Sequence, residues 1–309
     1  MRNINMVRIK LFLTAVFWGG TFIAGRVVAQ NMNPFEGAFL RFFIASVFLI
    51  FIVWRREGGL PKVDFSQFIS LTLLGMTGIF TYNIFFFSGL HHINTGRAAS
   101  IIASNPIFIS LFAAYFFKEK LSFAKIVGIM LSVSGALIVI SRGNITSVFT
   151  GGIGRGEFYI FLCVVSWVSY SLIGKKVMVR LSPLVSVSYS TLFGTLALSI
   201  PAIYKGMFLH LNSFSFPSWA SLFYLGFFGT VLGFIWYYEG INRIGPMKAS
   251  IFINFVPISA IVLAYLILGE KISVSLLGGT LLVISGVILT NFSRFYAIRK
   301  VLHLSKNKK

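Results

Sequence analysis

Long apolar stretches separated by short polar breaks recur along the whole chain. Each stretch has about 20 residues, the length at which an α-helix crosses the hydrocarbon core of a bilayer. A hydropathy window of about 19 residues predicts helices over 9–29, 35–54, 67–90, 98–117, 123–141, 157–174, 183–204, 219–241, 248–268 and 274–293. Helix-breaking residues mark several of the connections, at Asn33-Pro34, Gly58 to Pro61, Ser182-Pro183 and Gly245-Pro246. The pattern therefore predicts an all-α membrane protein with ten transmembrane helices.

Composition excludes most other classes of protein. The chain is 57% hydrophobic and only 11% charged, whereas soluble domains carry about 25% charged residues. A soluble globular enzyme, a disordered chain and a secreted disulfide scaffold are excluded. The single cysteine, Cys163, lies in an apolar run and forms no intrachain disulfide, so we expect it to pack in the core.

The net charge of +20 has a different meaning in a membrane protein than in a soluble one. In a soluble protein it would suggest nucleic acid as a partner, but here the lysines and arginines lie between the apolar segments and in the basic tail at 294–309. Most of them fall on one side of the membrane if the N-terminus is cytoplasmic, as the positive-inside rule requires. We expect both termini in the cytoplasm, no nucleic-acid partner, and contact between the tail and anionic lipid heads.

The two halves of the sequence align with each other at a shift of 149 to 151 residues. Trp18 aligns with Trp167 and Pro34 with Pro183, and the run 118–122 (KEKLS) aligns with 269–273 (GEKIS). This pattern predicts a first five-helix repeat at 1–142, a glycine-rich external linker at 143–156, a second five-helix repeat at 157–293 and a cytoplasmic tail at 294–309. Because five is odd, the second repeat enters the membrane from the opposite side, and the repeats are inverted, a construction known in secondary transporters.

Several segments resemble the EamA-type members of the drug/metabolite transporter superfamily. They are 17–22 (FWGGTF), 40–43 (LRFF), 248–257 (KASIFINFVP) and 269–271 (GEK), and the resemblance extends over about 9–292. It implies a ten-helix carrier of small organic solutes, commonly an exporter of amino acids or other metabolites. It also implies a central cavity lined chiefly by the first, third and fourth helices of each repeat.

Polar and aromatic residues inside the predicted helices are the candidates for a substrate site, because polar groups are costly within the membrane. Trp18 and Thr21 lie on one helical face, as do their repeat counterparts. Pro106 and Pro257 each leave the backbone carbonyl four residues earlier without its helical hydrogen bond, and a nearby serine or asparagine side chain can bind that carbonyl. An alternative for each aromatic is simple packing between helices. The predicted substrate-binding residues are Trp18, Thr21, Asn83, Phe87, Ser100, Asn105, Trp167, Tyr170, Trp236, Tyr237 and Asn254.

The charged residues suggest a carrier without strong proton coupling. All seven acidic residues fall at predicted helix ends or in loops, which leaves no carboxylate at the midplane as a proton relay. Arg41 lies inside the second predicted helix, where it either pairs structurally, reaches toward the lipid heads or binds a substrate carboxylate. Arg97 and Lys248 lie at the starts of the fourth and ninth predicted helices. Their charges either follow from membrane topology or attract an anionic group of the solute at an entrance to the cavity.

The sequence therefore predicts a multi-pass secondary transporter of the plasma or inner membrane. Its expected substrate is a small amphipathic or aromatic metabolite such as an amino acid. We expect the substrate to bind in a central cavity and to be exported by alternating access. A membrane-embedded enzyme, a scaffold or receptor and a channel are the alternatives. His91 and His92 are adjacent and point about 100° apart on a helix, which makes a poor metal site. We expect no metal and no cofactor, and the oligomeric state is open.

Overall fold

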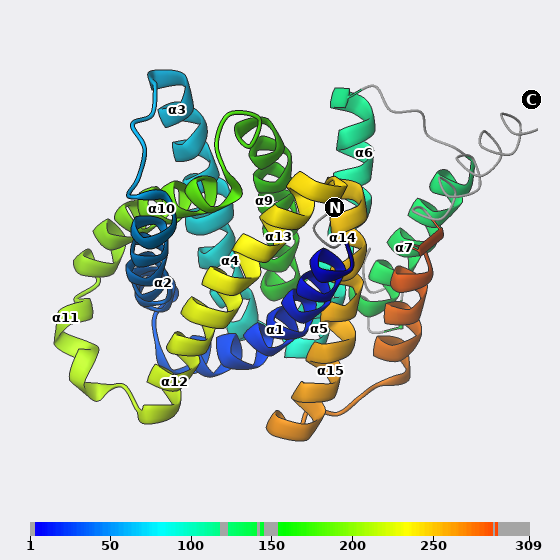
Figure 1. Cartoon of the computed structure of the whole chain (residues 1–309). Coiled ribbons are helices and arrows are strands. Elements are labelled where there is room, and N and C mark those ends of the chain that lie inside the picture. Colours follow the sequence, from blue (N-terminus) through cyan, green and yellow to red (C-terminus); the bar gives the residue numbers. More distant parts are fainter. Residues whose placement is uncertain (1–3, 118–122, 141–142, 145–153, 287, 290–309) are drawn as a thin grey trace, which may run out of the picture.

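The computed structural model describes residues 4–117, 123–140, 143–144, 154–286 and 288–289, and all regular structure within them is helical (Figure 1). In chain order the labelled elements are α1 (Ile4–Asn31), α2 (Pro34–Glu57), α3 (Phe65–Leu74), η1 (Gly75–Thr81), α4 (Tyr82–His92), α5 (Thr95–Ile102), α6 (Asn105–Phe117), α7 (Phe123–Ile140), α9 (Arg155–Val177), α10 (Pro183–Tyr204), α11 (Met207–His210), η2 (Leu211–Ser213), α12 (Phe216–Tyr224), η3 (Leu225–Leu232), α13 (Gly233–Ile244), α14 (Pro246–Ser250), η4 (Ile251–Asn254) and α15 (Phe255–Leu268). A last apolar helix, here called the final helix, runs over Val274–Gly286.

Helix occurs in each of the ten predicted ranges, but not always as one regular helix. Six helical runs are long and apolar enough to cross a membrane: α1, α2, the continuous run Phe65–His92, α9, α10 and the continuous run Phe216–Ile244. The other predicted ranges hold shorter helices, including α15 and the final helix. The chain is thus an all-helical membrane protein, and the count of ten crossings and the position of both termini remain predictions. The predicted tail, and most of the predicted linker, lie outside the described residues.

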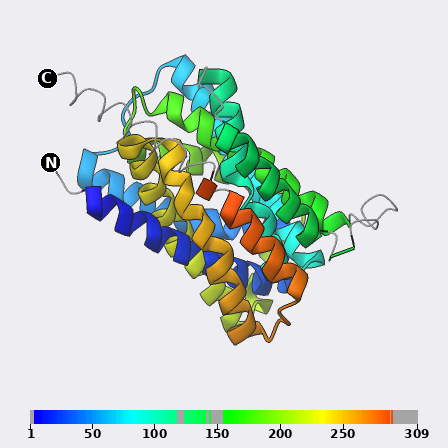
Figure 2. The same cartoon turned by 90° about the vertical axis from the view of Figure 1, so that its right-hand side faces the viewer.

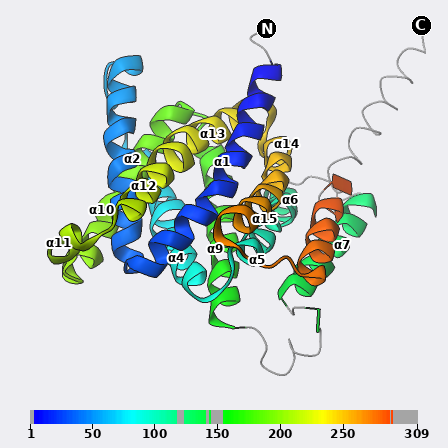
Figure 3. The ribbon, with the colours of Figure 1, turned by 90° about the horizontal axis from the view of Figure 1, so that it is seen from below.

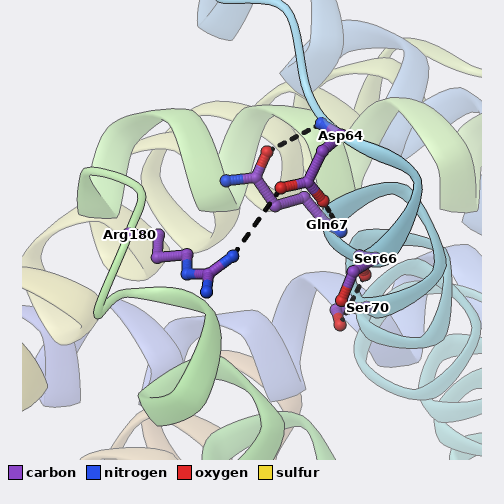
Figure 4. Close-up of polar contacts among 5 residues, drawn as sticks. All are labelled: Asp64, Ser66, Gln67, Ser70 and Arg180. Carbon is purple, nitrogen blue, oxygen red and sulfur yellow. Dashed lines mark hydrogen bonds and ion pairs between the residues drawn. The ribbon is translucent and has the colours of Figure 1, made fainter.

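Local capping explains where several helices begin. Asn33 caps α2 by accepting a hydrogen bond from the Phe35 amide at 3.0 Å, with Pro34 in the first turn. At the start of α3, Asp64 Oδ1 accepts from the Gln67 amide at 2.7 Å and Gln67 Oε1 accepts from the Asp64 amide at 2.9 Å (Figure 4). Arg180 Nη1 lies 3.7 Å from Asp64 Oδ2 and so links the connections before α3 and α10 at the surface (Figure 4). These helix starts follow from the sequence signals at the predicted breaks.

Two kinds of helical irregularity occur at matching places in the two halves. The third predicted helix of each half contains a π-helical segment, η1 in one and η3 in the other. The fourth predicted helix of each half is interrupted: α5 ends before α6 begins at Asn105, and the 3-10 segment η4 separates α14 from α15. The sequence predicted one regular helix in each of these ranges. The prolines that follow Asn105 and Asn254 explain the breaks, because proline lacks the amide hydrogen that helix continuation needs.

The first helix of each half packs against the third and fourth helices of the other half. Helix α1 contacts α13 and α15, and α9 contacts α4 and α5; Figure 2 shows α1 running beside α15. Helices α2 and α10 lie against each other, and each also contacts the π segment of the opposite half. The two halves are therefore interleaved rather than separate, and their junction lies at the centre of the molecule.

Three contacts join residues that the internal alignment makes equivalent, and we call them the matched pairs. The Trp18 and Trp167 rings meet edge to face with centroids 5.3 Å apart. The Ser46 and Thr195 hydroxyls lie 3.1 Å apart. Ser132 Oγ donates to the Val283 carbonyl at 3.0 Å. Each pair links one half to the other, at positions 149 or 151 residues apart.

Helix α7 and the final helix lie side by side at one edge of the molecule (Figures 1 and 3). Small residues allow this close approach. A Cβ atom at Gly279 would lie 2.7 Å from the Gly135 carbonyl oxygen, and one at Gly286 would clash with the Gly128 carbonyl oxygen. Close packing of backbones through small residues is a common way to join helices in membranes, where the hydrophobic effect does not drive their association.

Candidate functional site

A narrow cavity of about 40 Å³ lies at the junction of the two halves. Its walls come from α1, α2, α4, the break between α5 and α6, α9, α13, η4 and α15. These are the first, third and fourth predicted helices of each half, together with α2. The described lining residues are Trp18, Thr21, Phe22, Arg41, Tyr82, Phe86, Ile102, Asn105, Trp167, Phe234, Ile253 and Val256.

Aromatic rings form most of the wall. Trp167 meets Phe234 at 5.3 Å and Tyr82 at 5.5 Å, in addition to its contact with Trp18 in the matched pair. Trp18 is fixed in orientation, because its indole Nε1 donates to the Gly229 carbonyl in η3 at 2.9 Å. Offset and edge-to-face ring contacts of this kind are favourable. The cavity thus has a preformed aromatic face to which both halves contribute.

Arg41 provides the one charged group among the described lining residues. It lies within α2 and is only 4% exposed. Its Nε donates to Thr230 Oγ1 at 3.1 Å, and its Nη1 donates to Asn83 Oδ1 at 2.9 Å. Asn83 also donates to the Ile79 carbonyl at 2.8 Å and Thr230 to the Leu225 carbonyl at 3.0 Å, so both partners anchor on π segments. The guanidinium group therefore bridges α2 to the third helices of both halves.

Asn105 brings an amide to the cavity at the break between α5 and α6. Its side chain is buried, and its Oδ1 has no hydrogen-bond partner among the described residues. Thr21 behaves differently, because its hydroxyl donates to the Trp18 carbonyl at 2.6 Å within the same helix. A buried acceptor without a partner is uncommon, and this one belongs to a residue of the cavity wall.

The structure brings together only part of the predicted site. Trp18, Thr21, Asn105 and Trp167 line the cavity. The other predicted residues whose side chains are described and lie close behind the wall are Asn83, Phe87, Tyr170 and Tyr237. Tyr237 contacts the Trp18 ring at 5.2 Å, and Tyr170 contacts the Trp167 ring at 5.3 Å. These residues support the aromatic wall rather than form its surface.

The remaining predicted residues lie elsewhere or outside the description. Ser100 Oγ lies 2.7 Å from Thr280 Oγ1 and joins α5 to the final helix. Trp236 stacks on Phe17 at 5.9 Å and faces Lys10 rather than the cavity. The side chain of Asn254 is outside the described part of the structure. Substrate contact by any of the predicted residues remains a prediction.

Sequence reasoning missed Tyr82, Phe22, Ile102, Ile253 and Val256 as wall residues. Asn83 and Phe87 were predicted on the third helix as polar and aromatic residues within the membrane, but η1 has a wider turn than an α-helix and changes which residues face the centre. A register shift of this kind leaves no clear mark in the hydropathy pattern. The apolar residues carried no signal that separates cavity wall from core.

The two ends of the junction differ. Near the start of α1, Lys10 pairs with Glu239 at 2.7 Å beside an open hollow of about 700 Å³. Near the start of α5, Glu270 accepts from the backbone amides of Thr95 at 3.1 Å and Gly96 at 3.4 Å. Arg97 and Glu157 pair nearby at 3.4 Å, and the hollow at this end measures only about 50 Å³. The Glu270 contacts cap a helix of one half with a carboxylate of the other.

Most of the described acidic residues follow the sequence-based map. Glu36, Glu57, Asp64 and Glu157 lie at helix ends and Glu270 follows α15. Glu239 does not, because α13 extends from Gly233 to Ile244 and places it in the middle of the helix. None of them lines the cavity. Within the described residues, no three histidine, cysteine or acidic side chains gather as a metal site would require. Cys163 is buried as expected, and its Sγ donates to the Tyr82 carbonyl at 3.3 Å.

Comparison with known proteins identifies the family. The profile of the EamA-like transporter family matches residues 6–141 and again 154–292. An uncharacterized transporter YyaM of Bacillus subtilis is 28% identical, over 93% of this chain and 94% of that protein. A probable terminal-alkyne amino-acid exporter of Streptantibioticus cattleyicolor is 27% identical, over 91% of this chain and 92% of that protein.

A solved crystal structure supports the same fold. It aligns with a TM-score of 0.69 at 18% identity and covers 94% of this chain and 98% of its own. At that identity the likeness concerns the fold alone. With the six apolar helical runs and the transporter relatives, these matches make the chain a multi-pass transporter of the plasma membrane and not an enzyme. The chain belongs to the EamA-like transporter family.

Proposed function

We propose that this transporter exports amino acids or related small amphipathic metabolites through the central cavity. The observation that carries the proposal is the cavity itself, where aromatic rings from both halves meet two interrupted helices. Binding at a midplane site between interrupted helices is the usual arrangement in secondary transporters. The relative named as a probable amino-acid exporter supports the same substrate class.

Two inverted five-helix repeats provide the mechanism in this proposal. The matched pairs support a two-fold relation, because a residue on a two-fold axis meets its own equivalent. The π segments and helix breaks at corresponding positions support it as well. Rocking of one repeat against the other about this axis opens the cavity first to one side and then to the other.

The two ends of the junction fit alternating access. The end near Glu270 is held by contacts between the halves, whereas the end near Lys10 has the larger hollow. Opening the Glu270 end requires loss of its hydrogen bonds to the α5 amides. Because no carboxylate is among the described lining residues, we propose facilitated transport or exchange rather than steep proton coupling.

A reconstituted system tests the proposal directly. Purified protein in vesicles preloaded with amino acids, amines, nucleosides, sugars and organic acids should release the amino-acid class selectively, as measured by mass spectrometry with and without a pH gradient. Equal release of sugars and strong acids would contradict the substrate class. A steep dependence of release on the gradient would contradict the proposed lack of coupling.

Variants of two wall residues and of the sequence-predicted Asn254 test the location of the site. Trp18→Ala, Trp167→Ala and Asn254→Ala should each lower amino-acid release, by about tenfold for the tryptophans because a buried aromatic anchor contributes more than about 1.4 kcal/mol. Membrane insertion should be unchanged. Trp54→Ala is the matched control, since Trp54 is 62% exposed on α2. Normal release by all three variants would show that the site is elsewhere.

A further inference from the structure

Arg41 is a buried cation without an acidic partner. Its described hydrogen bonds go to the neutral side chains of Asn83 and Thr230, through Nε and Nη1. Among the described residues, Nη2 makes no hydrogen bond. Buried charges in proteins are normally paired with an opposite charge, and charges within a membrane generally mark a functional pathway. Arg41 therefore has no anionic partner among the described residues.

The fold itself does not need a cation at this position. Ser190 is the equivalent residue of the other half, 149 residues later. The local packing agrees: a Cβ at Gly226 would lie 2.9 Å from the Arg41 carbonyl oxygen, and one at Gly75 would lie 2.8 Å from the Ser190 carbonyl oxygen. The contact between α2 and η3 thus contains an arginine, whereas the equivalent contact between α10 and η1 contains a serine.

The second half fills this contact with neutral groups. The Ser190 hydroxyl lies 3.3 Å from Tyr170 Oη and donates to the Val187 carbonyl at 3.0 Å. A neutral side chain is therefore sufficient to join the second helix of a half to its neighbours. Arg41 joins the helices through Nε and Nη1, and its place in the cavity wall also puts it beside the space for a solute.

The surroundings of Arg41 suit a carboxylate. The outer guanidinium nitrogen Nη2 lies beside Gly229, where an added Cβ would come within 3.6 Å of it. A planar guanidinium group binds a carboxylate through two parallel hydrogen bonds, and the described wall contains no competing acid.

Asn105 adds a second polar group to the same cavity. Its Oδ1 is buried and accepts no hydrogen bond from the described residues. An ammonium group is a donor without acceptor capacity, so it complements this oxygen. Aromatic faces such as Trp18 and Trp167 attract cations too. A small solute that carries both groups offers a chemical partner to each of these two wall residues.

We propose that the transported solute is bound as a zwitterion, with its carboxylate on Arg41, its ammonium group near Asn105 and its apolar part against the tryptophan pair. This inference rests on the proposed transport of amino acids and adds the residues that bind the carboxylate and ammonium groups of the solute. Selectivity for the carboxylate resides in the first half of the chain alone, because Ser190 stands at the equivalent position of the second half.

The test compares amino acids with their α-amides, which keep the side chain and the amine but lack the carboxylate. Vesicles containing the full chain are loaded with L-leucine, L-methionine, L-phenylalanine and their three amides, and protein-dependent counterflow of each is measured by mass spectrometry. Thermal stabilisation of the purified protein by each solute gives a second readout that passive leakage does not affect. We expect the amino acids to be preferred by roughly tenfold or more, since hydrogen bonds to charged groups are the strong ones.

Variants assign the preference to Arg41. Arg41→Gln should reduce the ratio of amino acid to amide by roughly tenfold, whereas Arg41→Lys should retain part of it, because the charge remains but the paired hydrogen bonds are lost. Arg180→Gln removes an exposed arginine that pairs with Asp64 at the surface, and it should leave the ratio unchanged. The wild-type comparison does not depend on whether the Arg41 variants fold.

The outcomes separate the two proposals. If the vesicles transport none of these amino acids or amides, the proposed function fails, and this inference fails with it. If amino acids and amides are transported equally well, the transport proposal survives and the role of Arg41 is overturned. A preference for amino acids that persists in Arg41→Gln also overturns the assignment to Arg41.

Discussion

At the scale of single residues, Asn105 combines burial, an unpartnered oxygen and a place in the cavity wall. A buried acceptor that lacks a hydrogen bond costs the folded state about 1–3 kcal/mol. Functional positions often carry such a cost, because activity and stability make different demands on the same side chain. Asn105 therefore carries a stability cost at a position in the cavity wall, as the proposed solute contact would require.

Asn105→Ala should therefore separate stability from transport. We expect the midpoint of thermal unfolding in detergent to stay the same or rise, because an unpaired oxygen is removed. Amino-acid release should fall by roughly tenfold if a hydrogen bond to an ammonium group is lost. A scan of thermal stability alongside vesicle efflux checks both. A large loss of stability with normal efflux would show that Asn105 is a packing residue.

At the scale of helices, two neighbouring glycines of the final helix have opposite surroundings. A Cβ at Gly279 would meet Val139 Cγ2 at 2.5 Å and the Gly135 carbonyl oxygen at 2.7 Å, whereas one at Gly278 would meet nothing within 4 Å. Gly279 thus faces α7 at the crossing and Gly278 faces away. The crossing depends on small residues because backbones in contact leave no room for a methyl group.

Gly279→Ala should destabilise the protein, and Gly278→Ala should not. The clash at residue 279 involves backbone that cannot move aside, and overpacking of this kind costs about 1–3 kcal/mol. The neighbouring substitution is the matched control, because it adds the same methyl group to the same helix. Unfolding midpoints of the two purified variants provide the comparison. Equal midpoints would contradict the close approach of α7 and the final helix.

At the scale of the whole molecule, the matched pairs and the contacts at the ends are expected to behave differently during transport. Ser46 and Thr195 join α2 to α10 at equivalent positions, so rocking about a two-fold axis leaves their separation nearly constant. Thr95 and Glu270 join the halves at one end, where the same rocking must separate them. Alternating access therefore requires one contact to persist and the other to break.

Paired cysteines test this difference in a Cys163→Ala background. A disulfide between Ser46→Cys and Thr195→Cys, whose native hydroxyls lie 3.1 Å apart, should leave amino-acid efflux within about a factor of two. Thr95→Cys and Glu270→Cys, joined by a reducible bifunctional thiol reagent long enough to replace the glutamate side chain, should block efflux until the link is reduced. Gel mobility reports cross-linking and vesicle efflux reports transport. If cross-linking residues 46 and 195 blocks transport reversibly, their separation must change during transport, and the proposed rocking motion is wrong.

Much of the general architecture was predictable from the sequence. Long apolar stretches must become helices in a bilayer, because every backbone polar group needs an internal partner there. Breakers such as Asn33-Pro34 and Ser182-Pro183 marked helix starts that the structure confirms through their caps. The aligned tryptophans, Trp18 and Trp167, pointed to the centre of the molecule, where both line the cavity.

The sequence by itself determined that the chain is an all-helical membrane protein of the EamA-like type. Hydropathy and the order of short motifs can be read from the sequence without knowing which helices pack together. Tertiary structure decided which of the polar residues share a cavity. Ser100 and Trp236 face other helices, while Tyr82 and Arg41 reach the wall. The physical reason is that π segments and helix breaks change the direction of side chains, and the packing of one half against the other selects which of them meet.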